Sequence, residues 1–449
     1  MRPWLGLGHD PCWRGQQVDL NRTRYRPSLR KLNIMEKYIM ATNSKPLEGL
    51  TIVEISAFIA APYAGLHLAQ LGAEVIRIDP IGGGLDFNRW PITKDGRSLY
   101  WSSLNMGKKS LSLNMKDPKA QDIVRDLLAQ KGQGQGMVIT NLGARGWMSY
   151  EALCAVRPDL IMVQILGNRD GSVALDYTVN ARVGYPWLTG PAEANDQPVN
   201  HVMPMWDVVT GMLAANALLV ALRNRESNGQ GQLIKIPLAD AAMSVVSNLG
   251  LMAEVMVNDE ERPRLGNHVY GTFGCNFATA DGRQVMITAF TPRHWTALVA
   301  ATQTEEQMQA LAASHGVDLK KEENRYLLRD DIEKILQPWF AQRSLEAIGA
   351  LLDEHQACWG PYQTVRQLVD EDPYASLENP MFQLVDQPHI GSYRVAGSPL
   401  DFSKHQRVAP TASPTLGGDN KDILTNRLGV SEDDFHALVA EGVVGAVAE

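Results

Sequence analysis

The order of the apolar segments at the start of the core constrains this chain more than any other feature. Near residue 46 the sequence reads LEGLTIVEIS, a short β-branched run, then APYAGLHLAQLGA, with apolar residues at helical spacing, and then EVIRIDP, a second strand-like run. Strand, helix and strand in this order form a unit with two parallel strands. Similar units follow, and their strand-like runs, such as MVITN and DLIMVQIL, are nearly all apolar, as expected of strands covered on both faces. The sequence therefore predicts an α/β fold built on a doubly wound parallel sheet.

Changes in pattern divide the chain into four parts, which are residues 1–45, 46–260, 261–358 and 359–449. The first is rich in Arg and Pro without a helical or strand period, so we expect a disordered extension outside the core, with Met35 or Met40 as the natural start. The second holds the parallel units. In the third, an Asp281-Gly282 pair between strand patterns is typical of a hairpin and predicts a smaller α+β domain with an antiparallel sheet. The fourth combines a Pro-, Gly- and Asp-rich extended connection with a short helical tail at 432–441.

Charge and cysteine content exclude several classes of function. A net charge of -8 carries no general attraction to polyanions, and the chain has no Lys/Arg run with interleaved aromatics, so nucleic acid is not an expected partner. The four cysteines are far apart without a Cys-x-x-Cys pair, which predicts neither disulfides nor a metal site. We therefore expect a reduced, cytoplasmic protein. The apolar run Val208–Leu222 is shorter than the roughly 20 residues of a bilayer span, so we predict a buried core helix and no membrane anchor.

An α/β unit near the start raises the question of a dinucleotide site. The corresponding fingerprint needs glycines in the turn after the first strand, whereas this turn reads SAFIAAP, so NAD binding is not predicted. Asp79 and the glycines Gly82–Gly84 resemble parts of such a site. A flexible turn and a phosphate contact stay open as alternatives for these glycines.

One acid, Asp207, stands at the start of the longest apolar run, in MPMWDVVTGMLAANALL. Asp is a favoured N-cap residue, so we expect its side chain to accept a hydrogen bond from the N–H of Val209 or Thr210. A helix N-terminus also lowers the pKa of a carboxylate and would hold it as an anion beside an apolar pocket. Such an anion can act as a nucleophile. Asp176 is the competing acid, but it precedes a Gly- and Pro-rich stretch, which favours a structural turn.

Several segments resemble the family III CoA-transferases. DVVTGMLAANALLVAL, with the following NGQGQLIKI, resembles the family signature, in which the matching Asp begins a helix and a Gly-x-Gly-Gln turn follows. The opening unit, NMGKKSLSLNM, VITNLGARG and the closing TLGGDNKDILTNRLGVSEDDFHALVAEGVV resemble further family motifs. These motifs occur in the family's order and cover residues 46 to about 445.

The resemblance implies an architecture and a reaction. It implies a Rossmann-like large domain built from both ends of the chain, a smaller central α+β domain, and ring-shaped chains in an interlocked homodimer. It makes Asp207 the nucleophile that attacks an acyl-CoA thioester, giving a mixed anhydride and CoA thiolate. The thiolate then forms an aspartyl-CoA thioester, and a carboxylate takes the CoA back by the reverse steps. Coenzyme A, as the substrate thioester, is the implied cofactor, without a metal, and backbone N–H donors must stabilise each oxyanion.

The same resemblance implies seven CoA-binding residues, which are Phe58, Ile59, Ala60, Lys108, Asn141, Leu142 and Arg145. Lys108 and, more weakly, Arg145 would meet the phosphates, and the others would follow the adenine and pantetheine. Where some members have a run of glycines, this chain has RLGNHVYGTFG. Gly266 and Gly271 are there the candidate oxyanion donors and lid glycines, and His268 and Tyr270 are candidates to touch the acyl group.

Within the family, the chain looks most like the intramolecular branch, the mesaconyl-CoA transferases. IDPIGGGLDFNRWP, VNHVMPMWDVVTG and LGNHVYGTFG carry this similarity. The branch moves CoA between the two carboxylates of one diacid, so the pocket should hold a carboxylate with a cation or hydroxyl. His201 ranks first among the available groups, which also include Arg89, Arg182, His268 and Tyr270.

Three alternatives to an intramolecular transferase stay open from the sequence. An intermolecular CoA-transferase would depend on an added carboxylic acid. An α-methylacyl-CoA racemase would use Asp207 and His201 as an acid and base and would exchange the α-proton. A non-enzymatic acyl-CoA-binding protein would not depend on Asp207.

Overall fold

The computed structural model of the chain describes residues 44–193 and 196–447. The predicted N-terminal extension, residues 1–45, lies almost entirely outside the described residues. One compact unit, formed by residues 45–401 and 407–449, contains every helix and strand discussed below.

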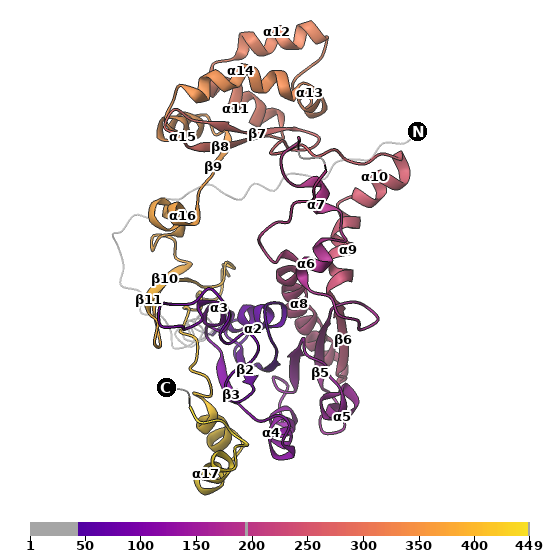
Figure 1. Cartoon of the computed structure of the whole chain (residues 1–449), viewed down its shortest axis with the longest axis vertical. Coiled ribbons are helices and arrows are strands. Elements are labelled where there is room, and N and C mark those ends of the chain that lie inside the picture. Colours follow the sequence, from indigo (N-terminus) through magenta and orange to yellow (C-terminus); the bar gives the residue numbers. More distant parts are fainter. Residues whose placement is uncertain (1–43, 194–195, 448–449) are drawn as a thin grey trace, which may run out of the picture. The chain divides into compact units, whose positions relative to one another are not determined.

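Six parallel strands form the central sheet (Figure 1). They are β1 (Thr51–Ile55), β2 (Glu74–Asp79), β3 (Lys109–Ser112), β4 (Met137–Thr140), β5 (Ile161–Leu166) and β6 (Gln232–Pro237). Their spatial order is β3-β2-β1-β4-β5-β6, and each neighbouring pair is parallel, which confirms the predicted parallel α/β sheet. The strand order reverses between β1 and β4, so the carboxyl ends of these two strands are the topological switch point at which open sheets bind ligands.

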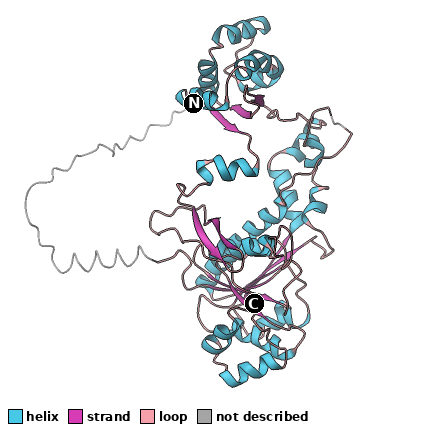
Figure 2. Ribbon diagram, turned by 60° about the vertical axis from the view of Figure 1, so that its left-hand side comes forward, coloured by secondary structure: helices cyan, strands magenta, loops and turns pink. Residues whose placement is uncertain are grey.

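Helices cover both faces of this sheet (Figure 2). Because side chains alternate along a strand, Ile52 of β1 is buried in the layer with α2 (Ala60–Ala69) and α8 (Met205–Asn228), whereas Val53 is buried in the opposite layer with α4 (Pro118–Ala129). The remaining helices between β1 and β7 are α3 (Leu99–Leu104), η1 (Gly146–Met148), α5 (Tyr150–Cys154), α6 (Asp176–Asn180), α7 (Tyr185–Leu188), α9 (Leu238–Asn248) and α10 (Leu251–Asn258).

Helix α8 is longer than the apolar run that the sequence analysis identified. Within the described part of the chain, it is long and apolar enough to cross a membrane by length and composition, and α9 with α10 pass the same test as a bent pair. However, Ala214, Leu218 and Ala221 of α8 are buried against the sheet layer that contains α2. This burial fits the predicted core helix.

A second, antiparallel sheet organises the segment after α10. It contains β7 (Phe273–Ala278), β8 (Gln284–Ala289) and β9 (Cys358–Pro361), and β8 pairs with both neighbours. The predicted Asp281-Gly282 turn joins β7 to β8, and Gly282 has a φ of 72° there, a conformation that glycine adopts without strain. Five helices lie between β8 and β9 in the chain, namely α11 (Pro292–Thr302), α12 (Glu305–His315), α13 (Glu322–Leu327), α14 (Arg329–Ala341) and α15 (Leu345–Glu354).

The final part of the chain contains more regular structure than predicted. The expected extended connection was wrong in part, because it contains α16 (Val365–Glu371), η2 (Pro373–Ala375) and a hairpin of β10 (Phe382–Gln387) and β11 (Gly391–Ala396). The predicted helical tail is present as α17 (Glu432–Ala440), after η3 (Asp422–Arg427). This last segment returns to the central sheet, since Ile423, Leu424 and Val444 share its core and Val444 pairs with Leu113.

Candidate functional site

A cavity of about 430 Å³ lies at the switch point of the central sheet. Its wall combines the loops that follow β1, β4 and β5 with the first turns of α2 and α8. Asp207 lines it together with five of the seven predicted CoA-binding residues, Phe58, Ile59, Ala60, Asn141 and Leu142. The fold therefore brings residues that are up to about 150 positions apart in the sequence into one pocket, as expected of a switch point.

Side-chain hydrogen bonds hold the two loops of the switch point together. The Asn141 amide bonds both backbone groups of Ala57, accepting from the N–H at 3.0 Å and donating to the carbonyl at 2.7 Å. Phe58 has a φ of 64°, which is uncommon for a residue with a side chain, and its N–H donates to Asp86 at 3.0 Å. These two bonds occupy the Asn141 side chain and fix the loop after β1. The start of α2 follows this loop and faces the pocket.

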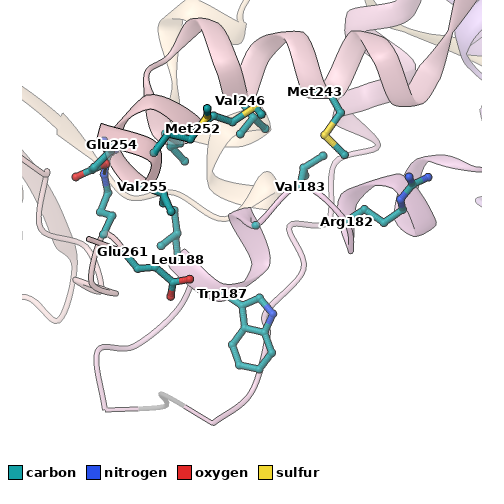
Figure 3. A pocket seen from close by; sticks show the side chains of 14 residues that line it. Arg182, Val183, Trp187, Leu188, Met243, Val246, Met252, Glu254, Val255 and Glu261 are labelled. Carbon is teal, nitrogen blue, oxygen red and sulfur yellow. Dashed lines mark hydrogen bonds and ion pairs between the residues drawn. The ribbon is translucent and has the colours of Figure 1, made fainter. Parts of the chain in front are cut away.

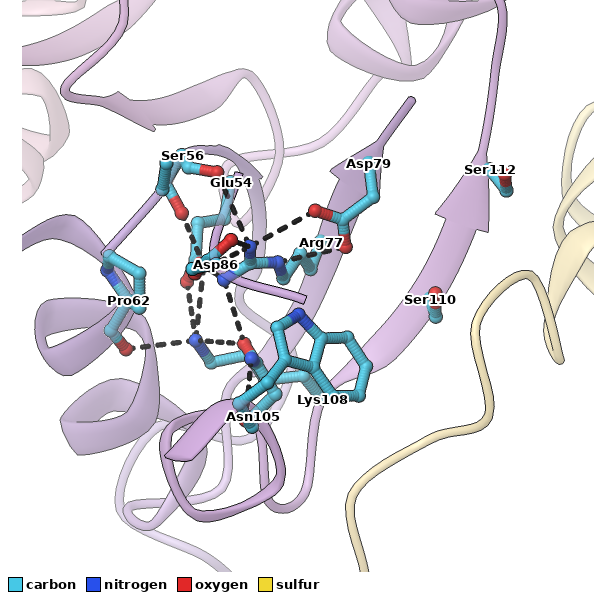
Figure 4. Close-up of polar contacts among 12 residues, drawn as sticks. Glu54, Ser56, Pro62, Arg77, Asp79, Asp86, Asn105, Lys108, Ser110 and Ser112 are labelled. Carbon is cyan, nitrogen blue, oxygen red and sulfur yellow. Dashed lines mark hydrogen bonds and ion pairs between the residues drawn. The ribbon is translucent and has the colours of Figure 1, made fainter. Parts of the chain in front are cut away.

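Next to this loop lie five buried charged side chains, Glu54, Arg77, Asp79, Asp86 and Lys108 (Figure 4). The Arg77 guanidinium pairs with Asp79 at 2.9 Å and with Asp86 at 3.1 Å. Lys108 Nζ lies 2.8 Å from Glu54 Oε2. Because Asp86 also accepts the Phe58 N–H, the buried ionic cluster supports the strained loop of the cavity.

Lys108 does not have the role that the resemblance implied. The residue is 5% exposed, and its amine donates to Glu54, to Asn105 and to the carbonyl of Pro62. Burial lowers the pKa of Lys108 to about 8, although the Glu54 carboxylate opposes this. The predicted contact with a CoA phosphate is wrong for this residue, because internal acceptors already surround the amine.

Asp207 is the third residue of α8 and not its N-cap, so the predicted bond to Val209 or Thr210 is wrong. Pro204 occupies the cap position without a side-chain hydrogen bond. Asp176 caps the helix from elsewhere in the chain, since its Oδ2 accepts the N–H of Trp206 at 2.7 Å and that of Asp207 at 3.1 Å. Asp176 is 3% exposed and begins α6, so it is a structural acid, although it lies in a helix and not in a turn. No described residue donates a hydrogen bond to the Asp207 side chain.

Burial, together with the Asp176 carboxylate, raises the pKa of Asp207 to about 7, while the Arg89 guanidinium acts in the opposite direction. The predicted lowering of this pKa is therefore wrong, because removal from water outweighs the helix N-terminus. An acid with a pKa near 7 is partly ionised at neutral pH. A substantial fraction of the Asp207 side chain is then an anion, and burial leaves this anion weakly solvated. Both properties favour nucleophilic attack.

A second cavity, of about 490 Å³, adjoins the first and shares Asn141 and Leu142 with it. Arg145, Arg169 and Lys235 contribute three cationic side chains to its wall. Arg169 pairs with Asp240 at 2.6 Å. Of these three cations, sequence reasoning proposed only Arg145. Lys235 lies on the strand β6, and only the folded sheet brings it to the same cavity as Arg145.

The other predicted site residues do not line the Asp207 cavity. His201 Nδ1 lies 2.6 Å from the Met203 carbonyl oxygen, and the described residues show no contact of its ring with Asp207, which removes support for an acid and base pair. Tyr270 donates to Glu254 at 2.5 Å. Gly266 and Gly271 have φ values of 60° and 79° in the same segment. Roles for these four residues in binding the acyl group or the oxyanion stay predictions.

His268 lies instead in a cluster with Cys275 and Glu333, whose ligand-type atoms lie within 4.8 Å of one another. Its Nε2 is 3.1 Å from Glu333. Burial strongly raises the pKa of the Cys275 thiol, and Glu333 adds to this. The expected absence of a metal stays a prediction.

A third cavity, of about 470 Å³, is mostly apolar and lies along α9 and α10 (Figure 3). Val246, Met252 and Val255 are among its lining residues, and Arg182 stands at its edge. No residue of α10 is buried. This helix therefore presents an apolar surface that a single chain leaves open.

Sequence reasoning missed Tyr100 and named Arg89 only as a candidate behind His201. Both line the Asp207 cavity. The guanidinium carbon of Arg89 lies 5.5 Å from the ring centre of Phe58 and 5.4 Å from that of Tyr100. Neither residue stands in a pattern of its own in the sequence, and only the stretch IDPIGGGLDFNRWP gave a signal for Arg89.

Comparisons with known proteins agree with this geometry. A family profile described as CoA-transferase family III matches residues 47–420. The chain is 47% identical over 399 residues, 89% of its length and 97% of the other protein, to 2-methylfumaryl-CoA isomerase of Chloroflexus aurantiacus. It is 27% identical over 415 residues to succinyl-CoA:glutarate CoA-transferase of Homo sapiens, covering 90% of each protein. A solved CAIB/BAIF family protein from Brucella suis has the same fold, with a TM-score of 0.69, 24% identity and coverage of 86% of this chain and all of that one.

Proposed function

Because this chain belongs to CoA-transferase family III, we propose that it moves CoA between the two carboxylates of mesaconate, as a 2-methylfumaryl-CoA isomerase. The 47% identity to a protein of that name over 97% of its length supports this activity. The observation that carries the mechanism is the Asp207 carboxylate, which stands in the switch-point cavity without a hydrogen-bond donor among the described residues. Asp176 is the other acid that the described wall of this cavity contains, and its Oδ2 caps α8.

The proposed reaction begins when an Asp207 oxygen attacks the carbonyl carbon of the thioester. The C–S bond breaks, CoA leaves as the thiolate, and a mixed anhydride joins Asp207 to the diacid. The thiolate then attacks the Asp207 carbonyl, which releases mesaconate and leaves an aspartyl-CoA thioester. The other carboxylate of the same mesaconate attacks this thioester, and the same two steps in reverse return CoA to the substrate and the carboxylate to Asp207.

Each attack produces a tetrahedral oxyanion, and the start of α2 is the proposed source of donors. The first N–H groups of a helix lack intrahelical acceptors, and Ile59 and Ala60 bring this helix end to the cavity wall. Phe58 cannot contribute, because its N–H is already bonded to Asp86. A donor of this kind contributes about 2.7 to 4 kcal/mol to transition-state stabilisation.

The two adjoining cavities fit the polarity of an acyl-CoA, because one is mostly apolar and the other carries cations. The acyl group and thioester would occupy the apolar cavity of Asp207, and the pantetheine would pass Asn141 and Leu142. The phosphates would then lie near Arg145, Arg169 and Lys235, where cations favour an anion. This arrangement replaces Lys108 with Lys235 as the proposed lysine at the phosphates.

We also propose a homodimer in the cytoplasm, with CoA as the only cofactor. The exposed apolar side chains of α10, among them Met256 and Val257, would be covered by the second chain. In that dimer, the loop with Gly266, His268 and Tyr270 would lie at the acyl-binding end of an active site. Multi-angle light scattering should give twice the mass of the chain, and a monomer would contradict the proposal.

The decisive experiment incubates the purified protein with 2-methylfumaryl-CoA and 13C-labelled free mesaconate. Formation of the isomeric thioester without 13C incorporation is expected, because CoA moves within one diacid. Borohydride or hydroxylamine trapping followed by peptide mass spectrometry should modify Asp207 alone. Transfer that depends on the free acid would establish the intermolecular reaction. With a saturated 2-methylacyl-CoA as substrate, α-proton exchange in heavy water without a trapped adduct would establish a racemase.

Asp207→Asn should reduce isomerisation by at least about a thousandfold, because removal of a covalent nucleophile leaves only binding and the oxyanion donors. Asp433→Asn is the matched control, since Asp433 also lies in the first turn of a helix, α17, but is exposed there. The control should keep full activity. Retained activity in Asp207→Asn would contradict the proposed nucleophile.

A further inference from the structure

Two side chains of the Asp207 cavity, the exposed Arg89 and the partly buried Tyr100, have no polar partner among the described residues. Arg89 makes no ion pair with any described residue, although its guanidinium is held between the rings of Phe58 and Tyr100 at 5.5 and 5.4 Å. The Tyr100 hydroxyl is buried and has no hydrogen-bond partner within the described chain. A buried hydroxyl without a partner costs about 1 to 3 kcal/mol, so a ligand that supplies an acceptor there would recover free energy.

The backbone fixes these two side chains relative to each other. Ser98 caps α3, the helix that carries Tyr100, and its hydroxyl donates to the Arg89 carbonyl oxygen at 2.5 Å. The Arg89 N–H in turn donates to the carbonyl of Asp86 at 3.1 Å, and Asp86 belongs to the buried ionic cluster. The pair is therefore held by the same internal structure that shapes the Phe58 loop.

The charges of the cavity favour an anion at Arg89 once the Asp207 carboxylate has reacted. Arg89 is the cation that opposes the rise in the pKa of Asp207. Burial raises the pKa of Tyr100 to about 12, and Arg89 only partly offsets this, so the hydroxyl stays a proton donor. Once Asp207 is acylated it loses its charge, and Arg89 no longer faces the Asp207 carboxylate.

We propose that Arg89 and Tyr100 together bind the free carboxylate of the substrate and so select dicarboxylic acyl-CoA thioesters. A guanidinium and a hydroxyl are the donors that a carboxylate takes most readily, and both lie on the wall that Asp207 shares. This assignment rests on the proposed CoA transfer. It explains how mesaconate is retained while CoA is bound to Asp207. The carboxylate that Arg89 and Tyr100 held then leaves them to attack the Asp207 thioester, and the carboxylate released from Asp207 takes its place.

The test compares two thioesters in the half-reaction that forms aspartyl-CoA. The rate of Asp207 modification at low thioester concentration is measured by mass spectrometry with mesaconyl-CoA and with crotonyl-CoA, which lacks the second carboxylate. For Tyr100→Phe and Arg89→Gln we expect the ratio of the two rates to fall at least tenfold relative to the unmodified protein. Arg89→Lys, which keeps the charge, should recover part of the ratio.

Tyr177→Phe is the matched control. Tyr177 lines the same cavity, but its hydroxyl already donates to the Val202 carbonyl at 2.8 Å, so the ratio should not change. Equal slowing with both thioesters in Tyr100→Phe and Arg89→Gln would reduce these residues to structural roles and overturn the proposal. If the unmodified protein forms aspartyl-CoA with neither thioester, the proposed transfer itself fails, which is a distinct result.

Discussion

The buried ionic cluster and the Asp207 cavity both gather carboxylates around cations, but they differ in how those charges are satisfied. In the cluster, Arg77 faces Asp79 and Asp86, and Lys108 faces Glu54, all within 3.1 Å. In the cavity, Asp207 and Arg89 make no ion pair with a described residue. Charges that are paired inside the protein maintain the fold, whereas charges left unpaired beside a cavity are available to a ligand.

The most direct test of this difference between the cluster and the cavity is to remove a cation from the cluster. Arg77→Met should destabilise the protein by about 3 to 5 kcal/mol, because it leaves the buried Asp79 and Asp86 without their counter-ion. The loss is measured as the free energy of unfolding in urea. Arg366→Met is the control, since Arg366 is 83% exposed and pairs with Asp370 only on the surface, and it should change stability by less than about 1 kcal/mol. Similar losses in both variants would remove the distinction between cluster and surface.

The opposite result is expected in the cavity, where removing a charge should stabilise the fold. The pKa of Asp207 rises from 3.8 to about 7 in the folded protein, so the folded state binds a proton that the unfolded chain has released. The unmodified protein therefore loses stability as the pH rises from about 4 to about 7. Asp207→Asn should be more stable at pH 8 by about 2 to 4 kcal/mol and similar at pH 4.

Urea unfolding at the two pH values measures this difference. Asp433→Asn, whose carboxylate is exposed, should show no gain that depends on pH. A gain for Asp207→Asn that is equal at both pH values, or larger at pH 4, would show that burial does not hold this acid in its protonated form. The same variant thus separates the cost of placing Asp207 in the cavity from its chemistry.

The parts of the site that the sequence predicted are those that depend on local pattern. The alternation of strand and helix predicted the sheet, and the start of an apolar run predicted that Asp207 opens a buried helix. The ends of two strands then place Phe58 and Asn141 at one cavity, because parallel strands end at the same edge. The proposed roles of Phe58 and Asn141 came from the resemblance to a family, because the fold alone does not assign roles.

The parts that failed depend on contacts between distant residues. Lys108 is occupied by Glu54, 54 positions earlier, and α8 is capped by Asp176, 31 positions before Asp207. The pKa of Asp207 follows from burial, which is a property of the folded chain. The hairpin of β10 and β11 was missed because its strands alternate weakly and lie within a stretch rich in Pro, Gly and Asp.

A smaller effect should follow from changing the contact between α8 and α2, which sets the position of Asp207. Gly211 lies one turn after Asp207, and a Cβ there would lie 2.6 Å from the Ala60 carbonyl oxygen. Gly211→Ala should therefore cost about 1 to 3 kcal/mol of stability and lower kcat/KM by about tenfold, because α8 must move away from α2. Gly360→Ala is the control, since a Cβ at that residue meets nothing within 4 Å. Unchanged kinetics in Gly211→Ala would show that the cavity tolerates a displaced helix.

The smallest effect is expected at the rim of the second cavity, where Lys235 is unpaired but also exposed to water. Lys235 is exposed on β6 and has no described ion-pair partner, so it would hold a CoA phosphate only through a solvated contact. Lys235→Ala should raise the KM for acyl-CoA by about three- to tenfold at low salt and leave kcat unchanged, because the phosphates are bound equally in the ground and transition states. The difference should shrink at 0.5 M salt, since ions screen exposed charges. Lys131→Ala changes an exposed lysine outside the cavities and serves as the control. A salt-independent rise in KM would mean that Lys235 acts through packing, and would confine the proposed phosphate contacts to the arginines of that cavity.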